Sequence, residues 1–513
     1  MRHRGRGGPG VSGRDGVWLP TGEEAAAFDT ASHAIVPERV MMENAGRAAA
    51  AIIQKLHPHG RILGYAGSGH NGGDLLVALR TLHCQGRDVS IITTGSRPVD
   101  TSLLNGHTLE LHSFSGSDAI AHDVIVDGIL GTGVRDAPRG NAAAAIAAIN
   151  ASGRPVIALD LPSGVNASDG NIPGDVVNAE TTITFGWPKL GLLLYPGRAH
   201  CGRIIATEIG FPPATGFDAE AITPGWAIAR TPRREPDAHK GSSGRLLILA
   251  GQNGMAGAAL IATEAAVRSG AGLVRIASDA ANRALLQVGV PEAMFVDRAA
   301  LSTDDVARAT AVVAGPGIGQ DAAARRALDI ILDASIDVPT LLDADALNML
   351  AQDPSALHAA ANRPLLLTPH PLELARLLGA DVADVTRDRV AAAREAARTF
   401  GCVVLAKGQP SIVADPDGGV LVNTAVTSDV AAAGMGDQLA GVAGGFLAAG
   451  SDPRTAAGLA LYYGGRAAQL ARRGRALSPR DVTGALATAF ADPGDVACSL
   501  GIPGITFDQH SPA

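Results

Sequence analysis

Short apolar segments alternate with longer alanine-rich segments along nearly the whole chain, and this alternation constrains the fold more than any other feature of the sequence. Alternating strand-like and helix-like segments are typical of βαβ units, which build parallel sheets covered by helices. The fold class predicted for both halves is therefore α/β. Strands are predicted at 61–65, 89–93, 123–127, 155–160, 182–185 and 203–208, then at 245–250, 273–276, 311–314, 340–343, 365–368, 403–406 and 420–423; helices are predicted at 39–56, 74–85, 141–150, 257–269 and 437–449.

The alternation stops once, between residues 211 and 241, where prolines and a cluster of charged residues replace it. Such a break is typical of a linker between domains. A chain of 513 residues also exceeds one domain of roughly 100–200 residues. We expect a disordered leader at 1–17, a first domain at 18–220, a linker at 221–240, a second domain at 241–500 and a C-terminal tail at 501–513.

Charge and cysteine usage exclude several classes of protein. The net charge is -8 and aromatic residues make up 3% of the chain, so neither a basic face for phosphates nor stacking platforms for bases are expected, and nucleic acid is not a predicted partner. The four cysteines lie far apart without a zinc-ligand spacing, which favours a reducing cytoplasm. No apolar run reaches the roughly 18 residues of a membrane span, so no membrane partner is predicted.

A glycine-rich turn follows the first predicted strand of the first half. Residues 67–74 contain the GxGxxG pattern of dinucleotide-binding turns, which alone is a weak signal. Asp74 is predicted at the start of the next helix, where its charge would compete with a pyrophosphate for the backbone donors. A simple N-cap role for Asp74 is the alternative.

Polar residues also end or follow later strands of this half. Because the carboxyl ends of parallel strands meet in one crevice, Asn71, Asp127, Asp160 and Ser163 are expected to converge. Oxygen ligands without a cysteine or histidine cluster suit a hard monovalent or divalent cation. Each residue alone could be only a turn former.

These motifs, together with residues 42–46 and 185–189, resemble the NAD(P)H-hydrate epimerase family over about residues 20–215. The resemblance implies a potassium ion held by Asn71, Asp127 and Ser163, and Asp160 as the acid/base residue. This chain departs from the family at His70 and Leu75, which puts close approach of a substrate in question. The resemblance implies substrate binding by His70, Asn71, Gly72, Gly73, Asp74, Gly131, Thr132, Gly133, Val134, Arg135, Asp136, Ala137 and Asp160.

A second glycine-rich turn lies late in the second half, where Gly434 and Gly436 precede Asp437 and an apolar helix. Backbone N–H groups at such a helix start stabilise phosphoryl charge. A carboxylate beside that charge suits a general base that takes a proton from an attacking hydroxyl. An N-cap role for Asp437 is the alternative.

This half resembles the ribokinase-like fold, and its motifs at 239–241, 254–259, 315–319, 342–348, 368–371 and 407–408 resemble ADP- or ATP-dependent NAD(P)H-hydrate dehydratases. The chain departs from that family at Leu372, at 427–430 and at Tyr463. The resemblance implies that Lys407, Gly408, Gln409, Pro410, Ser411 and Gly436 bind the nucleotide, and that Ala258, Gly317, His370 and Asp437 face the hydrated nicotinamide.

The two resemblances together are those of the bifunctional NAD(P)H-hydrate repair enzymes, with a Rossmann-like three-layer N-terminal domain. They imply epimerisation of R and S forms of NADHX and NADPHX, dehydration of the S form at the expense of ADP or ATP, and use of potassium and magnesium. A homo-oligomer in the cytoplasm is expected. Two alternatives stay open: a small-molecule kinase with an N-terminal nucleotide-binding domain, and a first half that serves only as a binding scaffold.

Overall fold

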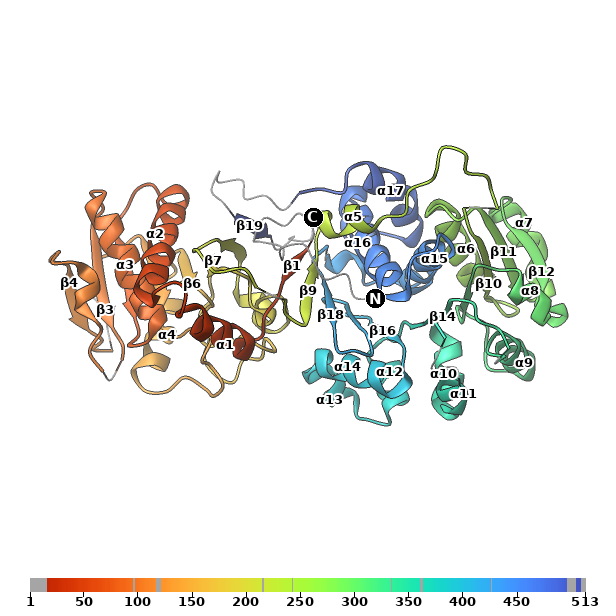
Figure 1. The fold of residues 1–513 in the computed structure, drawn as a ribbon, viewed down its shortest axis with the longest axis horizontal. Coiled ribbons are helices and arrows are strands. Elements are labelled where there is room, and N and C mark those ends of the chain that lie inside the picture. The colour runs from red at the N-terminus through yellow and green to blue at the C-terminus, as the bar shows by residue number, and fades with distance from the viewer. Residues whose placement is uncertain are drawn as a thin grey trace. The chain divides into compact units, whose positions relative to one another are not determined.

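The structure is a computed structural model that describes residues 16–95, 97–116, 121–214, 216–241, 243–333, 335–359, 363–425, 427–495 and 504–508. The described residues divide into two compact units, one comprising residues up to 220 together with 504–508 and the other comprising residues 221–495. Figure 1 shows helices and strands of both units along the chain. Residues 1–15 of the expected leader lie outside the described residues, and Val17 of that leader starts a two-residue strand.

The first unit is a three-layer α/β/α sandwich, as predicted. Its sheet has the order β19-β8-β7-β6-β5-β2-β3-β4, and all neighbours are parallel except the β19–β8 pair. Helices α2 and α3 pack on one face and α4 on the other. The elements are β1 (Val17–Trp18), α1 (Gly22–Ser32), α2 (Glu38–Leu56), β2 (Ile62–Ala66), α3 (His70–Cys84), β3 (Val89–Thr93), β4 (Glu110–Ser113), β5 (Val124–Gly128), α4 (Asn141–Ala151), β6 (Val156–Leu159), β7 (Thr181–Phe185), β8 (Arg203–Thr207) and β19 (Gly504–Phe507).

The order in which the chain adds strands to this sheet changes direction between β2 and β5. After β2 the chain continues to β3 and β4 on one side, and then returns to β5, β6, β7 and β8 on the other. In open parallel sheets, ligands bind outside the carboxyl ends of the strands at such a switch point. The turns after β2, β5 and β6 therefore define where a site can form.

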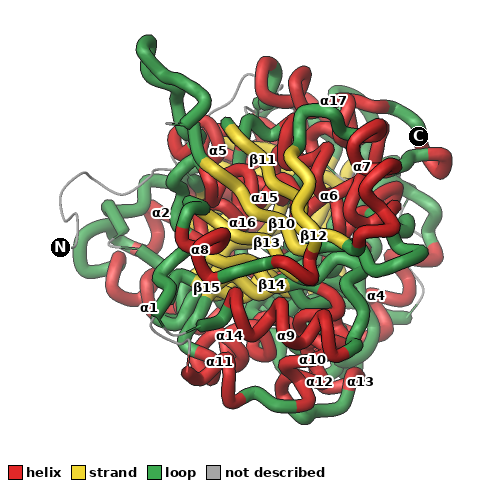
Figure 2. Tube along the Cα trace, turned by 90° about the vertical axis from the view of Figure 1, so that its right-hand side faces the viewer, coloured by secondary structure: helices red, strands yellow, loops and turns green. Residues whose placement is uncertain are grey.

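The second unit contains a mostly parallel sheet between helices (Figure 2). The strand order is β9-β18-β17-β16-β15-β14-β13-β10-β11-β12, with β17 antiparallel to both of its neighbours. The elements are β9 (Ala219–Ile222), α5 (Pro224–Arg230), β10 (Arg245–Leu249), α6 (Ala256–Arg268), β11 (Leu273–Ser278), α7 (Arg283–Gly289), β12 (Met294–Asp297), α8 (Thr303–Ala307), β13 (Ala311–Ala314), α9 (Ala322–Ile331), β14 (Thr340–Leu342), α10 (Ala344–Gln352), α11 (Ser355–Ala359), β15 (Leu365–Leu367), α12 (Pro371–Leu378), α13 (Val382–Arg387), α14 (Arg389–Phe400), β16 (Val403–Ala406), β17 (Ile412–Ala414), β18 (Val420–Asn423), α15 (Met435–Ala448), α16 (Pro453–Ala471) and α17 (Pro479–Ala491).

Helices α6, α15, α16 and α17 pack together in this unit and share one buried cluster with the strands. The sheet has its own switch point between β10 and β13, because the chain continues from β10 to β11 and β12 before it returns. The ends of β10 and β13 are joined there by hydrogen bonds from the Gly251 and Gln252 amides to the carbonyls of Pro316 and Gly317. A second site is therefore expected at this edge.

Two segments that were expected to lack helices and strands contain them. The expected linker 221–240 includes the end of β9 and all of α5, whose Thr223 caps the helix by accepting a hydrogen bond from the Trp226 amide. The expected tail 501–513 includes β19, which pairs antiparallel with β8 at the sheet edge. Both segments are short and rich in glycine or proline, so their strand and helix patterns are too brief to detect in the sequence. Contacts with distant parts of the chain stabilise these elements instead.

Trp226 provides a test of whether α5 belongs to the core of the second unit. Its side chain is 0% exposed and lies in the buried cluster, against Gly458. We expect Trp226→Ala to lower the free energy of unfolding of this unit by about 3–5 kcal/mol, measured by urea denaturation. Ile228→Ala on the same helix is the control, because Ile228 is 46% exposed, and a change of less than about 0.5 kcal/mol is expected. Equal effects of the two changes would contradict a core role for α5.

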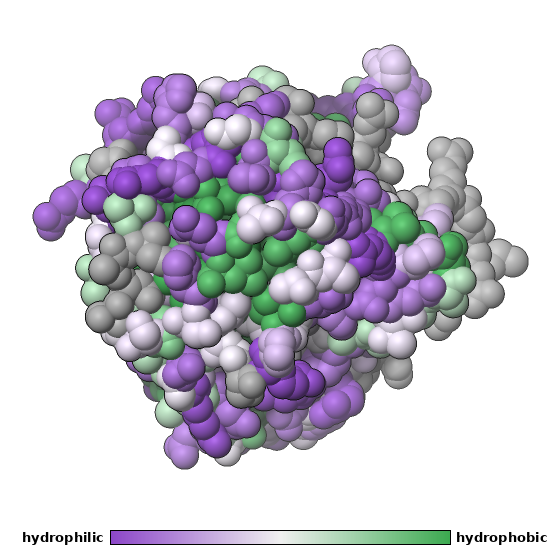
Figure 3. Space-filling model, turned by 90° about the vertical axis from the view of Figure 1, so that its left-hand side faces the viewer, coloured by the Kyte–Doolittle hydropathy of each residue, from purple (hydrophilic) through white to green (hydrophobic). Residues whose placement is uncertain are grey.

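The surface of the first unit carries an apolar area. Seen from the side of β4, hydrophobic residues gather in the middle of the face and hydrophilic residues surround them (Figure 3). Leu111 on β4 is among the exposed large hydrophobic residues of the unit. Within the described residues, no helix is long and apolar enough to cross a membrane.

Candidate active sites

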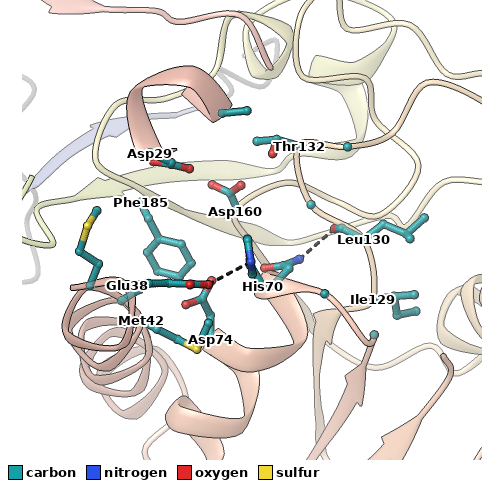
Figure 4. Close-up of a pocket in the computed structure, with 18 of the residues that line it drawn as sticks. Asp29, Glu38, Met42, His70, Asp74, Ile129, Leu130, Thr132, Asp160 and Phe185 are labelled. Atoms are coloured by element: carbon teal, nitrogen blue, oxygen red, sulfur yellow. Dashed lines mark hydrogen bonds and ion pairs between the residues drawn. The ribbon is translucent and has the colours of Figure 1, made fainter. Parts of the chain in front are cut away.

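A pocket of about 540 Å³ opens at the switch point of the first unit. The turn after β2, the turn after β5, Asp160 after β6 and Lys189 after β7 line it, and α1 and α2 contribute its other walls. Figure 4 shows several carboxyl groups that point into this space from different elements. The pocket thus collects polar side chains from segments that are far apart in the sequence.

Three predicted cation ligands meet beneath this pocket. The Ser163 hydroxyl donates to Asp127 Oδ1 over 2.7 Å, and the Ser163 amide donates to Asp127 Oδ2 over 2.8 Å. Ser163 Oγ also accepts from the Leu130 amide at 2.9 Å, while Asn71 Nδ2 donates to the Leu130 carbonyl at 2.9 Å. The network fixes Asn71, Asp127 and Ser163 around the turn that follows β5.

Two properties of this network concern ion binding. Asp127 is 0% exposed, and burial raises the pKa of its carboxyl to about 6, although the hydrogen bonds from Ser163 and Ile129 oppose that rise. Asn71 is 7% exposed, and among the described residues its buried Oδ1 atom has no hydrogen-bond partner. Burying a carbonyl oxygen without a hydrogen-bond partner costs free energy unless a ligand or ion contacts that oxygen. The chemistry of this donor set therefore fits a hard cation.

Asp160 forms an ion pair that the sequence analysis did not assign. Its Oδ1 atom lies 2.5 Å from Lys189 Nζ, and the side chains of Asp160 and Lys189 are 14% and 8% exposed. Lys189 also donates to the Phe185 carbonyl at 3.1 Å. Asp160 adopts a left-handed backbone conformation with φ of 62°, which is uncommon for a residue other than glycine and concentrates at functional sites. The turn therefore holds the Asp160 carboxyl, paired with Lys189, at the pocket wall.

The start of α3 differs from the prediction. The helix begins at His70, with Gly69 as its N-cap, so Asp74 lies in the second turn and does not cap the helix. The pocket residues include His70, Asn71 and Asp74, but not Gly72, which is buried against the Gly67 carbonyl. His70 is largely exposed and lies 3.0 Å from Glu38. Burial raises the pKa of Asp74 well above its usual range, and the charge of Asp160 adds to this effect.

The remaining predicted substrate residues divide between the pocket and its surroundings. Gly131, Thr132 and Gly133 line the pocket, whereas Gly73 lines a neighbouring cavity beside Arg39 and Arg97. Val134, Arg135, Asp136 and Ala137 are not among the residues that line either cavity, and Arg135 pairs with Glu23 at 2.8 Å.

Leu75, at which the chain departs from the epimerase pattern, does not line the pocket. It is 0% exposed and packs on β2 and β5, where Gly64 and Gly128 leave space for its side chain. A Cβ atom at Gly128 would lie 2.8 Å from Leu75 Cβ, and one at Gly64 would lie 3.1 Å from Leu75 and 2.5 Å from Leu79. Leu75 is therefore a core residue of this chain.

In the second unit, the predicted site residues Gly317, His370 and Lys407, together with Asp343 of a sequence motif, follow four neighbouring strands. Gly317 follows β13, Asp343 follows β14, His370 follows β15 and Lys407 follows β16. Gly317 has φ of 59°, and a Cβ atom there would lie 3.0 Å from Ala258 Cβ. Ala258 and Gly317 therefore lie together at the switch point, where a side chain on Gly317 would be crowded.

Asp437 lies in the first turn of α15 beside two other charged residues. Gly434 is the N-cap with φ of 84°, so Asp437 does not cap the helix. Lys407 Nζ pairs with Asp343 Oδ1, and Gly436 packs against Lys407. Burial first, and then the charge of Asp343, raises the pKa of Asp437 to about 6, while Lys407 acts in the opposite direction. A carboxyl with this pKa can exchange a proton near neutral pH.

A cavity of about 490 Å³ adjoins this turn. It is lined by five of the six predicted nucleotide-binding residues: Lys407, Gly408, Gln409, Ser411 and Gly436. Pro410 is not among its lining residues and follows a cis peptide bond with Gln409. The apolar side chains of Leu439 and Leu461 also line the cavity. The size and the mixed lining suit a nucleotide whose phosphates face Lys407 and the start of α15.

His370 has a structural role as the N-cap of α12. Its Nδ1 atom accepts hydrogen bonds from the Leu372 and Glu373 amides at 3.1 and 3.3 Å, and its own amide donates to Glu373 Oε2 at 2.9 Å. Its Nε2 atom lies 3.2 Å from Glu373 Oε1, and its side chain is 46% exposed. Tyr463 donates to or accepts from Thr231 at 2.8 Å and packs against Phe446 and Phe490. It is not among the residues that line the adjacent cavity.

These features define a class of enzyme with two α/β units, each of which has an aspartate at the carboxyl edge of its sheet. The aspartate of the first unit lies beside oxygen atoms that suit a cation, and the aspartate of the second unit lies beside a cavity of nucleotide size. Residues 38–191 match the family described as YjeF-related protein N-terminus, and residues 246–486 match the NAD(P)H-hydrate dehydratase family.

Curated relatives match most of the chain. The bifunctional NAD(P)H-hydrate repair enzyme of Moorella thermoacetica is 36% identical, over 90% of this chain and 93% of that protein. The enzyme of the same description from Escherichia coli is 36% identical, over 84% of each. A solved ADP/ATP-dependent NAD(P)H-hydrate dehydratase from Bacillus subtilis, co-crystallised with ATP and Mg²⁺, is 31% identical with a TM-score of 0.47, and the match covers 52% of this chain and 96% of that one. The chain belongs to the family of bifunctional NAD(P)H-hydrate repair enzymes.

Proposed function

We propose that the first unit interconverts the R and S forms of NADHX and NADPHX, and that the second unit dehydrates the S form to NADH or NADPH with ADP or ATP as phosphoryl donor. The observation that carries this proposal is the position of Asp437, a carboxyl of raised pKa at the start of α15, beside Lys407 and the nucleotide-sized cavity. The family membership supports both activities. The domain limits 18–220 and 241–500 are part of the proposal.

For dehydration, Asp437 accepts the proton of the hydroxyl on carbon 6 of the nicotinamide ring as that oxygen attacks the terminal phosphoryl group. The amides at Gly434–Gly436 and the ammonium of Lys407 stabilise the transferred charge. Phosphate then leaves carbon 6, a proton leaves carbon 5, and the ring double bond is restored. Asp343 holds Lys407 through their ion pair, so that the ammonium remains beside Gly436.

Magnesium would enter this site with the nucleotide. Among the described residues, no group of three or more histidine, cysteine, aspartate or glutamate side chains is arranged to hold a metal ion. The charges of Asp343 and Asp345 nevertheless both act on Asp437 at this edge of the sheet. Mg²⁺ commonly keeps few protein ligands and binds substrate phosphates, which fits one or two of these carboxylates.

For epimerisation, Asp160 exchanges protons during reversible inversion at carbon 6, and Lys189 orients its carboxyl group through the 2.5 Å contact. Potassium would be held by Asn71, Asp127 and Ser163. The Asn71 Oδ1 atom, which has no hydrogen-bond partner in the described part of the chain, fits a hard cation. When bound, it would supply a fixed positive charge that orients polar groups of the substrate. Burial of Met41 and Phe185 at the pocket wall limits access of water.

Asn71 provides a test of the potassium site. We expect Asn71→Ala to raise the half-saturating potassium concentration for epimer exchange by about tenfold or more, because a charge-dipole contact is lost. The measurement is the rate of epimer exchange against KCl, at ionic strength held constant with choline chloride. Asn150→Ala on α4 is the control, since Asn150 is exposed and bonds Val176. An unchanged potassium response would remove Asn71 from the site.

The proposed function is tested with a mixture of the two NADHX epimers, ADP or ATP, magnesium and potassium, and the absorbance of NADH is followed to completion. Conversion of the whole mixture supports both activities and identifies the donor. Recovery that stops when the S form is exhausted would contradict the epimerase. A stable phosphorylated product without NADH would instead favour a small-molecule kinase.

We also propose a cytoplasmic homo-oligomer. The apolar area on the first unit supports self-association, because contiguous exposed apolar patches mark interaction sites. The molar mass by light scattering tests this, and a value of one chain, 51.9 kDa, would contradict it.

A further inference from the structure

The carboxyl group of Asp29, on α1, faces the same pocket as Asp160 but belongs to no sequence motif. Figure 4 shows the side chains of Asp29 and Asp160 directed toward one another, the first from α1 and the second from the end of β6. Within the described residues, the Asp29 carboxyl makes no hydrogen bond and no ion pair, whereas Asp160 is paired with Lys189. Helix α1 also precedes residue 38, where the match to the N-terminal family begins.

The position of Asp29 is fixed by contacts on both sides of it. At the start of α1, Thr21 and Glu24 form a capping box, and the Gly22 amide donates to Ser168 Oγ at 3.0 Å. Next to Asp29, the Phe28 ring packs against Trp187 and Phe211 at centroid distances of 5.3 and 5.4 Å. Trp187 lies two residues before Lys189, so the same turn positions Lys189 and supports α1.

The electrostatic environments of the two aspartates differ. Burial raises the pKa of Asp29, the charge of Asp160 adds to this rise, and Lys189 opposes it. Asp74, Glu38, His70 and His33 are the other titratable groups that line the pocket. An unpaired half-buried carboxyl is therefore placed opposite one that is paired with a lysine, which is the arrangement of a proton donor and a proton acceptor.

We propose that Asp29 is the second acid/base residue of the epimerase, acting on the face of the nicotinamide ring opposite Asp160; this inference rests on the proposed epimerase function. Asp29 gives its proton to the hydroxyl on carbon 6, which leaves as water while the ring nitrogen donates its lone pair to carbon 6. Asp160 then takes a proton from a second water molecule, whose oxygen bonds carbon 6 from the other face. One C–O bond breaks and one forms. Asp29 has lost a proton to the departing water and Asp160 has gained one from the attacking water, so the pair is ready for the reverse reaction.

The test is the rate of exchange between purified R and S NADHX, in the full chain without ADP or ATP, followed by chromatography and corrected for the spontaneous rate. We expect Asp29→Asn to slow exchange by about 10²-fold or more, and Asp29→Glu to retain more activity than Asp29→Asn. Asp88→Asn is the matched control, because Asp88 is exposed and outside the pocket. In H₂¹⁸O, each inversion by the wild type should add one ¹⁸O atom at carbon 6.

The outcomes separate this inference from the proposed function. If the wild type does not accelerate exchange, the epimerase function itself fails. If the wild type does so and Asp29→Asn keeps the wild-type rate, or if inverted product lacks ¹⁸O, the role of Asp29 is overturned while the epimerase stands. Dehydration of S NADHX by Asp29→Asn, assayed in the same preparation, should match the wild type and shows that the second unit is intact, while the activity retained by Asp29→Glu shows that the first unit tolerates substitution at this position.

Discussion

Replacing Asp437 with asparagine is expected to abolish recovery of NADH from S NADHX while the exchange between R and S forms continues. Asparagine keeps the size of the side chain but cannot accept the hydroxyl proton. Loss of a general base lowers a rate by about 10²–10⁴-fold. The measurement is NADH absorbance with ADP or ATP in excess, together with epimer exchange assayed by chromatography in the same preparation.

The pH dependence of the wild type provides an independent check on Asp437. A general base must be deprotonated, and burial together with the charge of Asp343 raises the pKa of this carboxyl to about 6. The dehydration rate should therefore fall as the pH decreases through about 6 and reach a plateau above it. Asp345→Asn would remove one of the charges that raise the pKa of Asp437, so the falling limb should move to lower pH. A profile that does not move would contradict this electrostatic account.

A matched variant distinguishes chemistry from folding. Asp452→Asn removes an N-cap carboxylate of α16 that bonds the Thr455 amide on the surface, so it should change stability slightly and leave the dehydration rate unaltered. If Asp437→Asn retained more than a tenth of the wild-type rate, Asp437 would not be the base.

Buried strands could be predicted from the sequence because they form short continuous apolar segments. Strands β3, β13, β16 and β18 have the predicted limits, and β2 and β5 differ from them by one residue at each end. Strands β4 and β17 were missed because each is short and lies in a polar or loop-rich segment. Strand β19 was missed for a different reason: it pairs with β8, about 300 residues earlier, and a pairing of this range leaves no local pattern.

Site residues could be predicted where they follow the ends of neighbouring parallel strands, because such ends lie close together. Asn71, Asp127 and Ser163 illustrate this. Contacts between motifs were not predictable. Lys189 was seen within a motif, but its pairing with Asp160 depends on the fold of the turn after β7. The scarcity of lysine in this arginine-rich chain was a usable signal, since Lys189 and Lys407 both pair with site aspartates. Asp29 gave no signal because α1 reaches the pocket only through tertiary packing.

The second large effect is expected at the Asp160–Lys189 pair. Asp160→Asn should reduce epimer exchange by about 10²–10⁴-fold, toward the spontaneous rate, while dehydration of pure S NADHX is unchanged. With a mixture of epimers, NADH should then form rapidly until the S form is consumed and afterwards only as fast as spontaneous exchange supplies it. The measurement is the amplitude of the rapid phase, which should equal the S fraction of the mixture.

Lys189 variants test why the pair is needed. Lys189→Met leaves the Asp160 carboxylate, whose side chain is 14% exposed, without its counter-charge, and an unpaired buried charge is strongly unfavourable. Lys189→Arg keeps the charge but places it on a wider, planar group that does not fit the same three acceptors, Asp160, Thr184 and Phe185. We therefore expect exchange rates in the order wild type, Lys189→Arg, Lys189→Met. If Lys189→Met exchanged epimers as fast as the wild type, the ion pair would serve stability alone, and Asp160 would have to act without it.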